Sequence, residues 1–288
     1  MISFWEIILV SAISGFTIFT LLYLVGQLLK NASIIDIFWG LTFIAVSSIL
    51  FLWFSNEIVN SGFLAIPFYI MYGLIWYWGL RISIRIFIRN KGKGEDFRYK
   101  NWRNSWGKKY YWKMYLKNYM TQFLFNFILL TPIYFLIFST TSSLVVMHNS
   151  FNYFTLIGAF ISLMAITWEG VADYQLDKFI KTNNEKGKIL NTGLWKISRH
   201  PNYFGQQVIW YGFALMAITL MPTWAFFALI SPLFITLLFF TLSTPILENS
   251  MSKNPNWLEY AKITPRTIPF IGGKKVVLKH HLNNSDND

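Results

Sequence analysis

The feature that most constrains this chain is a series of apolar runs, each long enough to cross a lipid bilayer. A helix of about 20 residues crosses the roughly 30 Å of bilayer hydrocarbon. Only 13% of the 288 residues are charged and 54% are hydrophobic, whereas about a quarter of a soluble domain is charged. The sequence therefore predicts an all-α, polytopic membrane protein with seven transmembrane helices, at residues 4–29, 34–54, 63–88, 119–140, 153–172, 204–221 and 223–242.

The last two runs are separated only by Met221 and Pro222. One continuous helix would exceed the membrane thickness, and a helix breaks at proline. These two runs therefore predict a tight helical hairpin.

The basic residues indicate the orientation of the chain. With seven helices, one side of the membrane receives all 25 Lys and Arg, namely Lys30, twelve residues in 81–117, six in 178–199 and six in 253–279. The loops expected on the other side contain none. Because basic loops remain in the cytoplasm, this pattern predicts an outside N-terminus and a cytoplasmic C-terminus.

Composition also limits the partners. Cytoplasmic loops that face anionic lipid headgroups explain the net charge of +12, so we expect the lipid bilayer and an apolar small molecule as partners, and no nucleic acid. The chain has no cysteine and four scattered histidines, which predicts no metal site.

The absence of repeats and long linkers predicts one integral membrane domain, residues 1–288. Short outer loops and frequent Ile, Lys, Asn and Phe favour a bacterial inner membrane over the endoplasmic reticulum; the oligomeric state stays open.

Two charged stripes have the four-residue spacing of one helix face. Arg81, Arg85 and Arg89 end the third predicted helix, and Glu169, Asp173 and Asp177 end the fifth. The stripes could neutralise each other across the bundle. Alternatively, the arginines bind phosphates and the acids bind an amine or ribose hydroxyls.

A polar segment, GLWKISRHPNYFG at residues 193–205, directly precedes the sixth predicted helix. Pro201 is expected in the first turn of that helix, where the amide groups attract an anion or a carbonyl dipole. Asn202 lies just inside this apolar helix, so its amide side chain needs a hydrogen-bonding partner. A capped helix, with Arg199 reaching headgroups and Trp195 and Tyr203 in an aromatic belt, is the alternative interpretation.

Two further cytoplasmic segments carry aromatic and polar residues. The first, residues 102–119, interleaves aromatic with basic residues and is typical of a membrane-interface anchor. The second, residues 243–271, contains Glu248, Trp257, Tyr260 and TPRTIPFIGG. The prolines of that ending predict a packed, non-helical stretch.

Several motifs resemble the C-terminal domain of the steroid 5-alpha-reductase superfamily. They are WEGVADYQ, GLW, RHPNYFG, the downstream Glu and Tyr, and TPRTIPF, all within residues 150–272. IIDIFWG at 34–40 and GEDFRY at 94–99 are similar to patterns of the bacterial and plant subgroup. The resemblance implies a seven-helix fold whose last helices and cytoplasmic loops hold NADPH, beside a lipid-accessible cavity for a sterol-like, isoprenoid or other apolar enone.

The implied reaction is reduction of a conjugated carbon–carbon double bond. By resemblance, Asn202 contacts the nicotinamide end of NADPH, Asp173 helps to fix the nucleotide, and Asn90 with Lys93 matches an Asn and Arg in the loop after helix three. The residues expected at the cofactor are Arg81, Arg85, Asn90, Lys93, Asp173, Trp195, Arg199, His200, Asn202, Tyr203, Gln206, Trp210, Glu248 and Tyr260.

Two positions depart from the steroid enzymes. Gln206 stands where those enzymes have Glu, and Gly79 stands where they have a substrate-facing Tyr, with Tyr77 the nearest phenol. The expected catalytic acid is Asp36 or Tyr77, since an ionisable group among membrane helices is functional by default. Asp36 could instead cap the second predicted helix.

Two other functions are compatible with the same motifs. Membrane methyltransferases of isoprenylcysteine or phospholipids share RHPxYxG and use S-adenosylmethionine. The extended WEGVADYQ, GEDFRY and TPRTIPF matches favour the reductase. A catalytically silent lipid-binding scaffold is the third hypothesis, and turnover would distinguish it.

Overall fold

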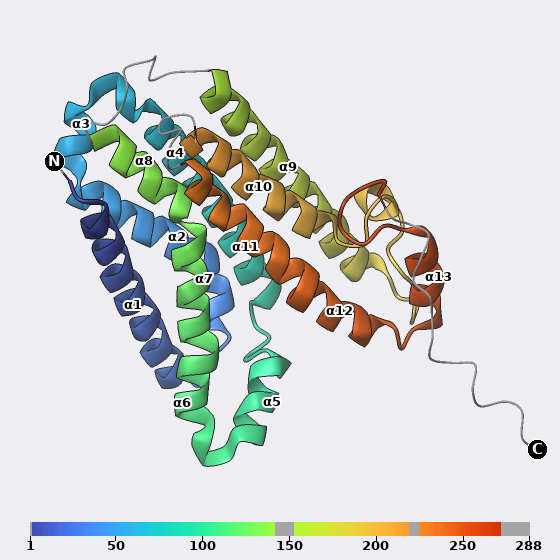
Figure 1. The fold of residues 1–288 in the computed structure, drawn as a ribbon. Helices are drawn as coiled ribbons and strands as arrows, with labels where there is room; N and C mark the ends of the chain where they lie inside the picture. The colour runs from blue at the N-terminus through green and yellow to red at the C-terminus, as the bar shows by residue number, and fades with distance from the viewer. Residues whose placement is uncertain (1, 142–152, 219–224, 272–288) are drawn as a thin grey trace, which may run out of the picture. The chain divides into compact units, whose positions relative to one another are not determined.

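The computed structural model describes residues 2–141, 153–218 and 225–271, and the regular structure of these ranges is entirely helical (Figure 1). The α-helices are α1 (Phe4–Leu28), α2 (Ile34–Trp53), α3 (Ser55–Asn60), α4 (Ile66–Asn90), α5 (Phe97–Trp106), α6 (Tyr110–Met114), α7 (Thr121–Leu129), α8 (Thr131–Thr141), α9 (Tyr153–Thr182), α10 (Pro201–Ile218), α11 (Ile230–Leu238), α12 (Thr244–Met251) and α13 (Pro255–Ile263). Short 3-10 turns are η1 (Gly62–Ala65), η2 (Gly107–Lys109), η4 (Gly193–Lys196) and η5 (Ala225–Leu229), and π-helical turns are η3 (Tyr115–Met120) and η6 (Phe239–Ser243).

The described helices are those of an integral membrane protein. Five are long and apolar enough to cross a bilayer, and a sixth span results if the bent pair Phe97–Leu129 and Thr131–Thr141 counts as one. The prediction of seven spans is therefore confirmed for five or six of them. The predicted hairpin turn at Met221 and Pro222 lies outside the described residues, and the orientation of the termini stays a prediction.

Within the described residues, α10 is not long and apolar enough to count as a span; it corresponds to the predicted run 204–221, whose last three residues lie outside the described ranges. It has 18 residues, but its first two turns carry Asn202, Gln206 and Gln207. These amides lower its mean hydropathy below that of a typical span. The same polar residues belong to the segment that the sequence singles out for function.

The chain forms two compact units. Unit 1 contains residues 1–163 and 209–235, and unit 2 contains residues 164–208 and 236–288. The chain passes from one unit to the other within α9, α10 and α11. The prediction of a single domain stays a prediction.

Unit 1 contains a glycine-mediated contact between α2 and α4. A Cβ atom added to Gly40 would lie 2.2 Å from the carbonyl oxygen of Gly79, and one added to Gly79 would lie 2.7 Å from that of Gly40. Gly158 and Gly212 allow a similar approach of α9 and α10 in this unit, where Ser162 Oγ donates to Ile209 O at 3.1 Å. Small residues at such crossings allow membrane helices to pack by backbone contact.

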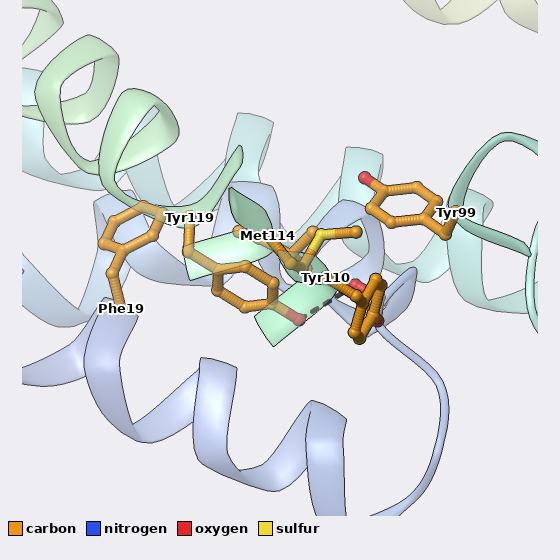
Figure 2. Close-up of a cluster of buried hydrophobic side chains, with 7 residues drawn as sticks. Phe19, Tyr99, Tyr110, Met114 and Tyr119 are labelled. Carbon is orange, nitrogen blue, oxygen red and sulfur yellow. Dashed lines mark hydrogen bonds between the residues drawn. The ribbon is translucent and has the colours of Figure 1, made fainter. Parts of the chain in front are cut away.

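A second packing centre in unit 1 joins α1 and α2 to the segment Phe97–Met120. Figure 2 shows the buried rings of Phe19, Tyr99, Tyr110 and Tyr119 around Met114. Tyr119 donates a hydrogen bond of 2.8 Å to the carbonyl of Ala32. The predicted interface segment, residues 102–119, thus has a buried side that packs on the bundle, while its Tyr111 and Trp112 are exposed.

Candidate functional site

The polar segment before α10 is attached to α9 by backbone and side-chain hydrogen bonds. Gly193 has a positive φ of 58° and lies against the side chain of Gln175, whose oxygen accepts a 3.0 Å hydrogen bond from the amide of Leu194. The indole of Trp195 donates to the carbonyl of Ala172 at 3.0 Å. An L side chain at 193 would meet both an unfavourable φ and the Gln175 amide.

The TPRTIPF segment closes the other side of this turn, non-helical and packed as predicted. The amides of Arg199 and His200 donate to the carbonyls of Pro265 and Arg266 at 2.8 and 3.1 Å. Ser198 Oγ donates to Thr267 O at 2.8 Å. α10 then begins at Pro201, as expected from the sequence. The two backbone N–H groups that immediately precede the helix are therefore already hydrogen-bonded to carbonyl oxygens of this segment.

One carboxylate, that of Glu248 in α12, lies among three basic side chains. Its Oε1 is 3.1 Å from Arg199 Nε and 3.0 Å from His200 Nε2, and its Oε2 is 3.3 Å from Arg266 Nε. Arg199 and His200 are about 95% buried. Burial lowers the pKa of the Arg199 guanidinium and the Glu248 charge partly opposes this shift. We name Glu248, Arg199, His200 and Arg266 the basic cluster.

Aromatic rings support the basic cluster. His200 stacks on Tyr203, and Tyr203 stacks on Phe239 with ring centroids 4.3 Å apart. Phe239 opens the π-helical turn η6, and π-helical turns are frequent at functional sites. Buried Tyr260 donates to the carbonyl oxygens of Trp195 and Ser198, and its burial raises the pKa of its phenol. These contacts fix α13 to the turn before α10.

Asn202 and Asp173, each expected at the cofactor, lie in the same unit and contact each other. Asn202 Nδ2 donates to Asp173 Oδ1 at 3.3 Å, and Asp173 is buried. The backbones are close here because Gly205 of α10 packs against Glu169 of α9, where an added Cβ would lie 3.0 Å from the Glu169 backbone nitrogen. The polar partner that the sequence requires for Asn202 is therefore an acid of the stripe on α9.

Unit 2 therefore brings together nine of the fourteen residues expected at the cofactor: Asp173, Trp195, Arg199, His200, Asn202, Tyr203, Gln206, Glu248 and Tyr260. The other five, Arg81, Arg85, Asn90, Lys93 and Trp210, belong to unit 1. Arg81 and Arg85 lie half-buried on α4, and Asn90 ends this helix. Trp210 is buried against Phe43 and Trp78.

The two candidate acids have different surroundings. Tyr77 is half exposed on α4. Asp36 lies in the first turn of α2, where Tyr99 donates to its Oδ1 at 2.6 Å and Arg98 to its Oδ2 at 2.8 Å. Arg98 also pairs with Asp96 at 2.9 Å. The IIDIFWG and GEDFRY motifs thus meet through these side chains, and Asp36 anchors the loop after α4.

This anchor leads to a stability prediction. We expect Tyr99→Phe to lower the free energy of unfolding by about 1–2 kcal/mol, because Asp36 Oδ1 loses a hydrogen bond at a partly buried site. Thermal unfolding of the purified protein in detergent measures the effect. Tyr111→Phe is the matched control, since Tyr111 is 61% exposed. Equal melting temperatures for the two variants would contradict the anchoring role.

Two residues of the site were not expected from the sequence. Arg266 lies in a motif that suggested packing alone, and its long side chain between two prolines is the signal that could have identified it. Gln207 is a buried polar residue in the second turn of α10, in the same unit as the basic cluster. A polar side chain in an apolar helix is the sequence signal that could have identified Gln207.

The donors of this site suit an anionic group. Gln207 Nε2 is buried and makes no hydrogen bond within the described part of the chain, while Arg199 Nε and Arg266 Nε form ion pairs with the carboxylate of Glu248 at 3.1 and 3.3 Å. Guanidinium groups bind phosphates through forked hydrogen bonds. With Glu248 as the only carboxylate in the basic cluster, these residues fit the phosphate of a dinucleotide such as NADPH.

Comparison with known proteins places the chain in one family. The profile of the family described as protein of unknown function, DUF1295, matches residues 22–267, which include both motifs of the Asp36 anchor and all of the basic cluster. No curated protein and no solved structure matches the chain. Since the match covers most of the 288 residues, the chain belongs to the DUF1295 family.

Proposed function

We propose that the protein is a membrane-embedded reductase that uses NADPH to reduce a carbon–carbon double bond of an apolar enone. The observation that carries this proposal is the Asn202–Asp173 pair in the same unit as the basic cluster. A dinucleotide needs both an amide-binding group and a phosphate-binding group. The relation of the DUF1295 family to the steroid 5-alpha-reductases supports the same reaction.

The proposed roles follow from the chemistry of each side chain. Asn202 offers a donor and an acceptor to the carboxamide of nicotinamide, and Asp173 orients it. Arg199 and Arg266, two guanidinium groups that share the single carboxylate of Glu248, are proposed to neutralise a phosphate. The basic residues at the end of α4 and in the following loop, Arg81, Arg85 and Lys93, are proposed to add to this binding, and Asn90 to position the loop.

The protein must also supply a proton to the product. NADPH supplies the hydride, so the residues of this chain position it and hold an acid near the carbonyl of the substrate. Both carboxylate oxygens of Asp36 accept hydrogen bonds from the anchor. Of the two candidates, half-exposed Tyr77 is therefore the one we propose as the proton donor.

The test is a ligand titration of the detergent-purified protein with NADPH, NADH and S-adenosylmethionine. We expect NADPH to bind, and Asn202→Ala to weaken it about tenfold, as loss of one hydrogen bond of about 1–1.5 kcal/mol predicts. Asn191→Ala is the control, because Asn191 is exposed in the same unit. Binding of S-adenosylmethionine without NADPH would establish the methyltransferase hypothesis instead, and binding of neither would favour a silent lipid-binding scaffold.

A further inference from the structure

A pocket of about 590 Å³ lies in unit 1, among α1, the α7–α8 bend and the start of α11. Buried Tyr134 and Phe135 are among its lining residues, and so are the exposed side chains Trp5 and Ile230. All the lining residues belong to candidate membrane spans or to the bent helix pair. The pocket therefore borders the hydrocarbon of the membrane rather than water.

The bend that shapes the pocket has a definite cause. α7 and α8 meet at 43°, and Pro132 has no N–H to donate to the carbonyl of Ile128 four residues before it. The hydroxyl of Thr131 donates to that carbonyl instead. The sequence Thr-Pro thus bends the helix while satisfying the backbone oxygen that the proline leaves without a partner.

The hydroxyl groups of the pocket, those of Tyr134 and Thr131, are hydrogen-bonded within the protein. The hydroxyl of Tyr134 lies 2.5 Å from Ser11 Oγ and donates to the carbonyl of Phe127 at 3.0 Å. The remaining side chains of the lining are aromatic or aliphatic, apart from Thr131. Apart from the indole N–H of exposed Trp5, a ligand therefore finds dispersion contacts here, which selects a hydrocarbon chain over a headgroup or a polar metabolite.

We propose that this pocket binds one acyl chain of a membrane phospholipid. The chain enters from the surrounding bilayer, past Trp5 and Ile230, and fills a space that would otherwise lack contact atoms. The volume is within the roughly 300–1,000 Å³ that ligand pockets occupy. The lining of this pocket shares no residue with the proposed NADPH site.

Photolabelling tests the proposal on the unmodified protein. The probe is phosphatidylcholine with a diazirine midway along one acyl chain, in vesicles of phosphatidylcholine. We expect crosslinks to concentrate within residues 4–8 and 127–138, the two segments that contain most of the lining residues, over exposed Leu21 and Leu24 on α1. Labelling in proportion to exposure would overturn the proposal.

A pocket-filling variant gives a second measurement. Ile8→Trp places an indole where the acyl chain lies, so labelling of residues 127–138 should fall about tenfold. Leu21→Trp is the matched control on the same helix, with a side chain 56% exposed outside the pocket, and should label as the wild type does. Unchanged labelling in Ile8→Trp would reject the site.

The acyl-chain proposal and the reductase proposal fail separately. Asn202→Ala should leave lipid labelling unchanged, and Ile8→Trp should leave the affinity for NADPH unchanged. If lipid labelling persists while NADPH does not bind, the acyl-chain site stands and the reductase proposal falls. If an apolar enone displaces the lipid during turnover, the pocket is the substrate site, and the acyl-chain proposal is overturned.

Discussion

Replacing Glu248 with glutamine is expected to lower the free energy of unfolding by about 3 kcal/mol, because two arginines and a histidine lose their only carboxylate in the basic cluster. Arg199 and His200 are almost fully buried, so water cannot replace the lost charge. The glutamine keeps the size of the side chain, which separates the loss of charge from a change of packing. Thermal or denaturant unfolding in detergent measures the change.

The matched control for this charge removal is Glu259→Gln. Glu259 pairs with Lys262 at 2.7 Å, but its side chain is 74% exposed. An exposed ion pair of this kind contributes about 0–1 kcal/mol. If Glu248→Gln destabilises the protein no more than Glu259→Gln does, the basic cluster does not hold α12 to the turn before α10.

The same cluster shows what the sequence could predict about the site. Proline chemistry is local, so the sequence predicted the start of α10 at Pro201 and the packed TPRTIPF stretch. The sequence also predicted that Asp173 lies in an acidic stripe on one helix and that Asn202 needs a polar partner, but it did not predict that these two residues pair. The convergence of Glu248 with Arg266 was not, because it depends on how α12 and the final segment fold back onto the turn.

The role of Asp36 as an anchor could not be predicted from the sequence either, because its hydrogen-bond partners are far away in the chain. From the sequence, its position suggested either a catalytic acid or a helix cap. Its partners Arg98 and Tyr99 lie more than 60 residues away, so no local pattern reports the anchor that they form. The sequence did predict the membrane spans, because the length and hydropathy of helices such as α1, α2 and α4 depend only on local sequence.

The departure at Gly79 has a physical explanation in the helix crossing. The steroid enzymes that this chain resembles have a tyrosine at the position that Gly79 occupies. Here the α4 backbone at Gly79 contacts the α2 backbone at Gly40, within the IIDIFWG motif. A side chain at 79 would begin 2.7 Å from a carbonyl oxygen, so this crossing excludes the tyrosine. The phenol of the proposed reaction must therefore come from another position, such as Tyr77.

We expect Gly40→Ala to destabilise the protein by about 3 kcal/mol, the upper end for an overpacked contact. The added Cβ would lie 2.2 Å from Gly79 O and 2.8 Å from Gly79 Cα, and these are backbone atoms that a rotamer change cannot move. Gly73→Ala on α4 makes the same change where no atom lies within 4 Å. Because alanine favours a helix over glycine by about 0.5–1 kcal/mol, this control should be neutral or slightly stabilising. A lower melting temperature in detergent for Gly40→Ala but not for Gly73→Ala would support the contact of α2 with α4 at Gly40 and Gly79. Equal melting temperatures for the two variants would show that the helices do not meet at these glycines.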